Sequence, residues 1–136
     1  MAAAKSNQLS TLVANMFTAG LLDDQFRQLE MLQDEGNPDF VAKVVMLFCE
    51  EGEHIIGELT KQFLCFCRDQ PCVDYGKVDT FVDQLWGNSA YVGAQRVKNT
   101  CIQFHACCQE KSKVGCLKTL DSLRNDFYDV CSMFIP

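Results

Sequence analysis

The feature that most constrains the fold is a long run of helical spacing that begins at Asn37 and Pro38. Asn37 suits an N-cap, proline is tolerated at the first helical position, and Asp39 is favourable near the positive end of the helix dipole. Apolar residues then recur at helical spacing to about Cys67: Phe40, Val41, Val44, Val45, Leu47, Phe48, Ile55, Ile56, Leu59, Phe63, Leu64 and Phe66. A helix of this length predicts one wall of a helical bundle.

Three further segments continue the helical pattern after a loop around Pro71. They run from about Asp74 to Tyr91, from Val97 to Cys108 with Ile102 on the inward face, and from Leu117 to Val130. We expect the tail from Cys131 to Pro136 to be frayed. Short connections between four substantial helices predict a bundle of about residues 38–130.

Two shorter amphipathic segments precede the bundle. Leu9 to Thr18 forms the first and ends at Gly20, while the second is capped by Asp23 and closed by Gly36. The predicted fold is therefore all-α, an antiparallel four-helix bundle with two additional short N-terminal helices, in a single domain spanning residues 1–136. A length of 136 residues with 48% apolar content is sufficient to bury one core.

Charge and composition narrow the classes of function. A formal net charge of −6 disfavours nucleic acid and anionic membranes as partners, because both require a cationic surface. The longest apolar run, Val44 to Cys49, is too short to cross a bilayer, so we expect an intracellular protein with no membrane partner. The nine cysteines are odd in number and lie mostly in helical segments, which indicates reduced thiols packed as small hydrophobes.

A metal site at the cysteines is disfavoured by their spacing. Cys65, Cys67 and Cys72 do not form the paired spacing of a zinc site, and no second pair completes four ligands. We expect neither a metal nor a cofactor.

The segment from Asp74 to Tyr91 has two different faces. Helical spacing places Val78, Phe81, Leu85, Ser89 and Val92 on a buried stripe. The opposite face carries an acid, an exposed indole and a glycine: Asp83, with Asp79, Trp86, Gly87 and Ala90. Glycine in a helix costs about 1 kcal/mol relative to alanine. Its presence indicates either clearance for something that lies above position 83, or a tolerated glycine beside a Trp86 ring that folds onto neighbouring side chains.

The run from Asp83 to Asn99 resembles the active-site signature of plant histidine-containing phosphotransfer proteins. That signature begins His-Gln-Leu-Lys-Gly-Ser-Ser and continues to Gly-Ala-Gln-Arg-Val-Lys-Asn, which this chain matches from Gly93 onward. The similarity covers roughly Met16 to Leu123. The resemblance implies an up-down-up-down helix order and a face that docks receiver domains.

The departures from the signature affect the residues that would accept and hold a phosphoryl group. The resemblance places Asp83 where the family has its phosphoaccepting histidine, Trp86 where it has a lysine, and Asn88 where it has a serine, while Gly87 and Gln95 are kept. A carboxylate generally needs a divalent cation to accept phosphate, because both reactants are negative. We therefore expect no catalytic residue and a poor acceptor at Asp83.

The resulting hypothesis is a pseudo-phosphotransfer protein. It would bind receiver domains of sensor histidine kinases and response regulators without accepting phosphate, and so inhibit a cytokinin-type relay in the cytoplasm and nucleus. Monomeric protein is expected. The predicted partner-binding residues all lie on or beside the signature: Asp79, Asp83, Gln84, Trp86, Gly87, Asn88, Ala90 and Gln95.

Two other classes of function stay open. The first is an active phosphotransfer intermediate that uses Asp83 or a relocated histidine. Only His54 and His105 are available, and neither has the glycine and lysine spacing of the signature, so we expect two surface or half-buried histidines. The second is a thiol-responsive adaptor, in which Cys65, Cys67, Cys72 or Cys107 reports oxidation.

Overall fold

The computed structural model describes residues 14–33, 36–64 and 73–134, and all regular elements in these ranges are helices. A short helical segment at residues 14–18 precedes the main elements. The main elements follow in chain order as α2 (Asp24–Leu32), α3 (Phe40–Leu64), α4 (Tyr75–Val92), α5 (Gln95–Gln109) and α6 (Lys113–Phe134). This arrangement confirms the predicted all-α fold.

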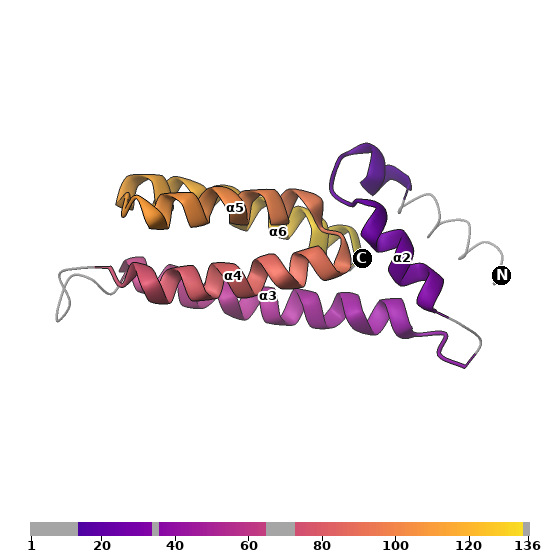
Figure 1. The fold of residues 1–136 in the computed structure, drawn as a ribbon. Helices are drawn as coiled ribbons and strands as arrows, with labels where there is room; N and C mark the ends of the chain where they lie inside the picture. The colour runs from indigo at the N-terminus through magenta and orange to yellow at the C-terminus, as the bar shows by residue number, and fades with distance from the viewer. Residues whose placement is uncertain (1–13, 34–35, 65–72, 135–136) are drawn as a thin grey trace.

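Helices α3, α4, α5 and α6 lie side by side as an elongated bundle, and α2 crosses one of its ends (Figure 1). The core is apolar and runs the length of the bundle. Phe63 of α3 meets Phe104 of α5 with ring centroids 6.5 Å apart, and Phe48 meets Phe127 of α6 at 5.5 Å. No helix in the described ranges is both long and apolar enough to cross a lipid bilayer.

The turn between α4 and α5 is tight and is held against α2. Gly93 has φ of 76°, the left-handed conformation that suits glycine at the end of a helix. Its backbone oxygen accepts a hydrogen bond from Asp23 N at 2.9 Å, and a Cβ atom there would lie 2.5 Å from Phe26 N. Gly93 therefore ends α4 and lies close to the backbone of α2, and it fixes where α5 begins beside α4.

Several details differ from the sequence-based expectations. The second N-terminal helix ends at Leu32, before Gly36, because Gln33 turns extended and its side-chain oxygen accepts a hydrogen bond from Val41 N. Ile102 is exposed on α5, since the buried stripe follows Val97, Cys101, Phe104 and Cys108. The loop predicted around Pro71 lies outside the described residues.

The expected fraying of the tail is wrong as far as Phe134. Helix α6 continues to that residue, and its ring packs on Phe26 of α2 with centroids 5.6 Å apart. This contact comes from an element more than 100 positions away in the chain, which local pattern cannot show. It stabilises the last turn of α6 and the crossing of α2 together.

Candidate functional site

Helix α4 presents the two faces that its sequence predicts. Val78, Leu85, Ser89 and Val92 are buried, and Ser89 satisfies its hydroxyl by donating to Leu85 O at 2.7 Å. Phe81 is only half-buried, however, and Val82 is buried in addition to the predicted stripe. The reason is that α4 contacts α2, α3 and α5, so its buried surface is wider than one narrow stripe.

The opposite face of α4 is open to solvent. Asp83, Gln84 and Gly87 are exposed, and the indole of Trp86 retains 44% of its surface. A Cβ atom added to Gly87 would meet no atom within 4 Å. The described chain therefore supplies no packing reason for this glycine.

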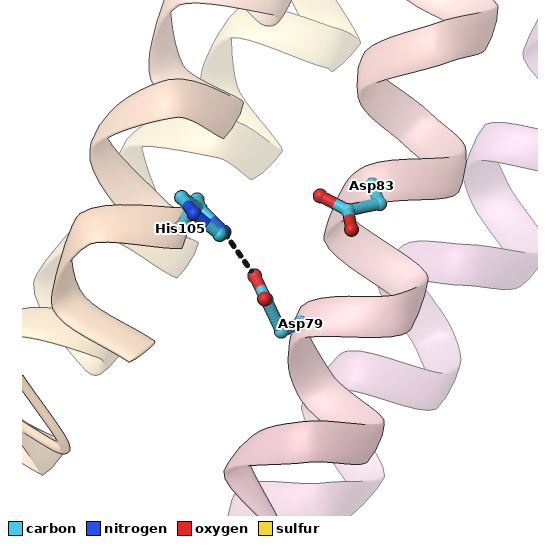
Figure 2. Close-up of side chains that lie close together, drawn as sticks. All are labelled: Asp79, Asp83 and His105. Atoms are coloured by element: carbon cyan, nitrogen blue, oxygen red, sulfur yellow. Dashed lines mark hydrogen bonds and ion pairs between the residues drawn. The ribbon is translucent and has the colours of Figure 1, made fainter. Parts of the chain in front are cut away.

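The structure brings His105 of α5 next to this face. Its Nδ1 donates to Asp79 Oδ1 at 2.7 Å, and Figure 2 shows the carboxylates of Asp79 and Asp83 directed toward the imidazole. The imidazole is 48% exposed, whereas the Asp79 side chain is 18% exposed. The hydrogen bond to Asp79, together with the charges of Asp79 and Asp83, raises the pKa of His105 above its ordinary value.

His105 matches the predicted surface histidine, but its position beside Asp79 and Asp83 was missed. The signal lies in the hairpin geometry of α4 and α5, which are antiparallel neighbours joined at Gly93. His105 lies 12 residues after Gly93. The position 12 residues before Gly93 is 81, midway between Asp79 and Asp83. Counting outward from the turn would have placed the three side chains at one level.

Other predicted site residues are separated from this cluster. Asn88 is directed to α3, where its Nδ2 donates to Glu51 Oε2 at 2.9 Å. Gln95 begins α5, whereas Asp83 precedes the end of α4 by nine residues, which corresponds to about 13 Å of helix rise. Gln95 therefore lies at the end of the bundle, far from Asp83 along the helix axis. The residue of α5 that lies beside Asp83 is His105.

A groove of about 270 Å³ runs along the surface between α3 and α4. It is largely apolar, and two of its walls are the exposed side chains of Leu47 and Tyr91. Asn88 also lines it, so the groove continues the open face of α4 toward α3. The combined surface has an indole, an apolar groove and two carboxylates within one stretch of helix.

The cysteines in the described ranges are free thiols, and Cys49, Cys101, Cys108 and Cys116 are buried. Burial, with a smaller contribution from the charge of Asp83, raises the pKa of Cys101 to about 12. The deeply buried thiols fit the prediction of cysteines packed as small hydrophobes. Cys65, Cys67 and Cys72 lie outside the described residues.

Comparisons with known proteins agree on one family. Residues 43–132 match the Hpt domain family. The chain is 58% identical to histidine-containing phosphotransfer protein 1 of Oryza sativa, over 98% of this chain and 87% of that protein. A crystal structure of a histidine-containing phosphotransfer protein from maize superposes with a TM-score of 0.86 at 51% identity, over 95% of this chain and 91% of the other.

A relative that is named as a pseudo form has a lower sequence identity to this chain. Pseudo histidine-containing phosphotransfer protein 6 of Arabidopsis thaliana is 33% identical over 92% of this chain and 79% of its own length. By overall identity, this chain is thus more similar to the rice phosphotransfer protein 1 than to this pseudo form.

Proposed function

This chain belongs to the plant histidine-containing phosphotransfer proteins, and on that premise we propose that it docks receiver domains through α4 without holding phosphate at position 83. Proteins of this family relay phosphate between kinases and response regulators. The observation that carries the proposal is the exposed carboxylate of Asp83, where the resemblance places the acceptor histidine. A protein of this kind would occupy receivers unproductively and inhibit a cytokinin-type relay in the cytoplasm and nucleus.

The surroundings of Asp83 support the chemical part of this proposal. One turn to either side, α4 carries Asp79, Thr80, Trp86 and Gly87, none of which is a cation. Phosphate transfer to a carboxylate brings two anions together and requires positive charge to offset them. The adjacent turns of α4 supply no such charge, and the one basic group of the cluster, His105, is hydrogen-bonded to Asp79. The exposed acid at position 83 is therefore a contact residue in this proposal, with no catalytic role.

The docking part rests on the indole and the groove. A large aromatic side chain that is nearly half exposed on a rigid helix is the kind of residue that dominates interface energetics. A separate apolar surface, the groove with Leu47 and Tyr91, lies between α4 and α3. We assign this combined surface to a receiver domain, because the relatives of this chain are phosphotransfer proteins.

A second candidate is an active intermediate that uses His105, and two observations favour it. Overall identity is higher to a phosphotransfer protein than to a pseudo form. In addition, an exposed imidazole lies on the same face as Asp83, with Nδ1 bonded to Asp79 and Nε2 available to attack. In that step the acyl phosphate bond of a receiver aspartate would break and a P–N bond would form at Nε2.

The raised pKa of His105 counts against that second candidate. A protonated imidazole has no free lone pair, so a larger protonated fraction near neutral pH lowers its reactivity toward phosphate. The signature glycine and lysine are also absent from its helix at the family's spacing. Unproductive docking is therefore the main proposal.

The experiment measures receiver binding by calorimetry and phosphate transfer from a phosphorylated receiver of the cytokinin pathway. We expect binding without transfer, and Trp86→Ala should weaken binding by about 30-fold, the equivalent of about 2 kcal/mol for an aromatic anchor. Tyr128→Ala is the matched control, because Tyr128 is 70% exposed on α6 and lies away from α4. It should bind as the wild type does.

The outcomes separate the two candidates. Acid-labile phosphate on the wild-type protein that is lost in His105→Gln would establish the active intermediate instead. Base-labile phosphate that is lost in Asp83→Asn would establish Asp83 as an acceptor. Absence of any receiver binding would overturn both candidates and leave another partner for the bundle.

A further inference from the structure

Three potential metal ligands converge between α4 and α5. Asp79 and Asp83 lie one turn apart on α4, and His105 approaches from α5 (Figure 2). One ligand atom from each residue can be chosen so that all three lie within 4.8 Å of one another. Two separate helices thus contribute an imidazole nitrogen and two carboxylate oxygens to one small volume.

The framework that holds these side chains is rigid. Helices α4 and α5 are packed along their length and are joined by the tight turn at Gly93. Val82, adjacent to Asp83 in α4, and Cys101 and Phe104 of α5 are almost fully buried. Sites built on packed helices hold their ligands more accurately than sites on loops, so little reorganisation of the backbone is required.

The donor set indicates the chemical class of the ion. Imidazole nitrogen suits Zn²⁺ and its neighbours in the first transition row, and carboxylate oxygens complete such sites. Three protein ligands with the remaining positions open to water is the arrangement of many zinc sites. We propose that Asp79, Asp83 and His105 bind one divalent transition-metal ion, typified by Zn²⁺, at the solvent-exposed edge between α4 and α5.

Binding requires only a local adjustment. Nδ1 of His105 and Oδ1 of Asp79 are 2.7 Å apart, which is a hydrogen-bond distance. Ligands that share a zinc ion at about 2.0–2.2 Å stand somewhat farther from each other. The pair therefore separates slightly and the imidazole releases its shared proton. Gln109 Nε2, 3.4 Å from Asp79 Oδ2, is placed to orient the carboxylate from outside the site.

The ion would change the charge of the proposed docking face. Asp79 and Asp83 together carry two negative charges on a chain whose formal net charge is already −6. A bound divalent cation offsets both charges, so the absence of phosphate transfer to Asp83 is expected only of the metal-free chain. Like charges at close range oppose the docking of an acidic partner, and the ion would reduce that repulsion. The site itself does not depend on the proposed function, because the ion binds the isolated chain.

The test is direct because the chain has only two histidines, His54 and His105. Mn²⁺ serves as the first probe, since it prefers carboxylate and imidazole ligands over thiols. Its paramagnetism should broaden the ring-proton resonances of His105 at substoichiometric concentration and leave those of His54 sharp. Asp83→Asn should remove the selective broadening. Equal broadening of both histidines, or of neither, would overturn the proposal.

Zn²⁺ calorimetry on the reduced full chain provides the second measurement. In His105→Gln the affinity of this one site for Zn²⁺ should fall at least tenfold. His54→Gln should bind Zn²⁺ as the wild type does. Both variants keep all nine cysteines, so binding by thiols contributes equally to each. Identical Zn²⁺ isotherms for the two variants would overturn the site. A failure to bind receivers would leave both measurements unaffected and would concern the proposed function alone.

Discussion

Two glycines in the long helices, Gly52 of α3 and Gly87 of α4, have opposite surroundings. A Cβ atom at Gly52 would lie 2.2 Å from Cε2 of Phe127, so the glycine admits an aromatic ring from α6. A Cβ atom at Gly87 would meet nothing within 4 Å. Each glycine costs its helix about 1 kcal/mol relative to alanine. Packing within the chain accounts for the first glycine, whereas no packing in the described part of the chain requires the second.

The largest effect in this comparison is expected from Gly52→Ala. The ring of Phe127 is also packed on Phe48, so the new methyl group displaces an interlocked pair of rings. We expect the free energy of unfolding to fall by about 1–3 kcal/mol, the usual cost of overpacking a core. Urea denaturation followed by circular dichroism measures it.

Gly57→Ala is the matched control for that prediction. Gly57 lies on the same helix and is exposed, and a Cβ atom added there would meet no atom within 4 Å. Its replacement should raise the free energy of unfolding by up to about 1 kcal/mol. If Gly52→Ala proved as stable as Gly57→Ala, the ring of Phe127 would have moved into the cavity of about 420 Å³ that it lines.

Gly87→Ala tests the other half of the comparison. Stability should rise by up to about 1 kcal/mol, as at Gly57, because alanine favours the helix and nothing obstructs it. Receiver binding should weaken by roughly tenfold, since the methyl group occupies clearance that the partner uses. Calorimetry and urea denaturation of this variant and of Gly57→Ala measure the two effects. Unchanged binding in Gly87→Ala would remove the functional explanation of this glycine.

The two glycines also show what the sequence can predict. Helical spacing and cap residues were sufficient for the bundle and for the open face of α4, because these features depend on residues close in the chain. The partner of Gly52 was not predictable in this way. Phe127 is 75 positions away, and only the packing of α3 against α6 brings it there.

The candidate site likewise contains residues that local periodicity predicts and one that only the packing of two helices brings into place. Asp79, Asp83 and Trp86 share a face by helical periodicity alone, so their proximity and the exposure of Asp83 and Trp86 followed from the sequence. Asp79 is only 18% exposed, because it also faces α5. His105 belongs to another helix, and its approach to Asp79 depends on where the turn at Gly93 ends α4. The roles of these residues in docking stay predictions, which the variants described above test.

The smallest expected effect is at Asp83, one turn before Gly87 on the same open face. Without transition-metal ions, Asp83→Asn should tighten receiver binding about two- to fivefold, because it removes one exposed charge that opposes an acidic partner. Asp121→Asn is the control, since Asp121 is an exposed acid on α6. Calorimetry at two salt concentrations measures the change, which should shrink as screening increases.

Added Zn²⁺ should reverse the sign of that effect. With the ion bound, the carboxylate of Asp83 no longer repels the partner but holds the cation that attracts it, so Asp83→Asn should then weaken receiver binding. Asp121→Asn should leave receiver binding unchanged both with and without Zn²⁺. Tighter binding of Asp83→Asn both with and without Zn²⁺ would separate the metal site from docking. In that case the clearance at Gly87 would be explained by the partner's side chains without a metal ion, and Asp79 and Asp83 would affect docking only through their negative charge.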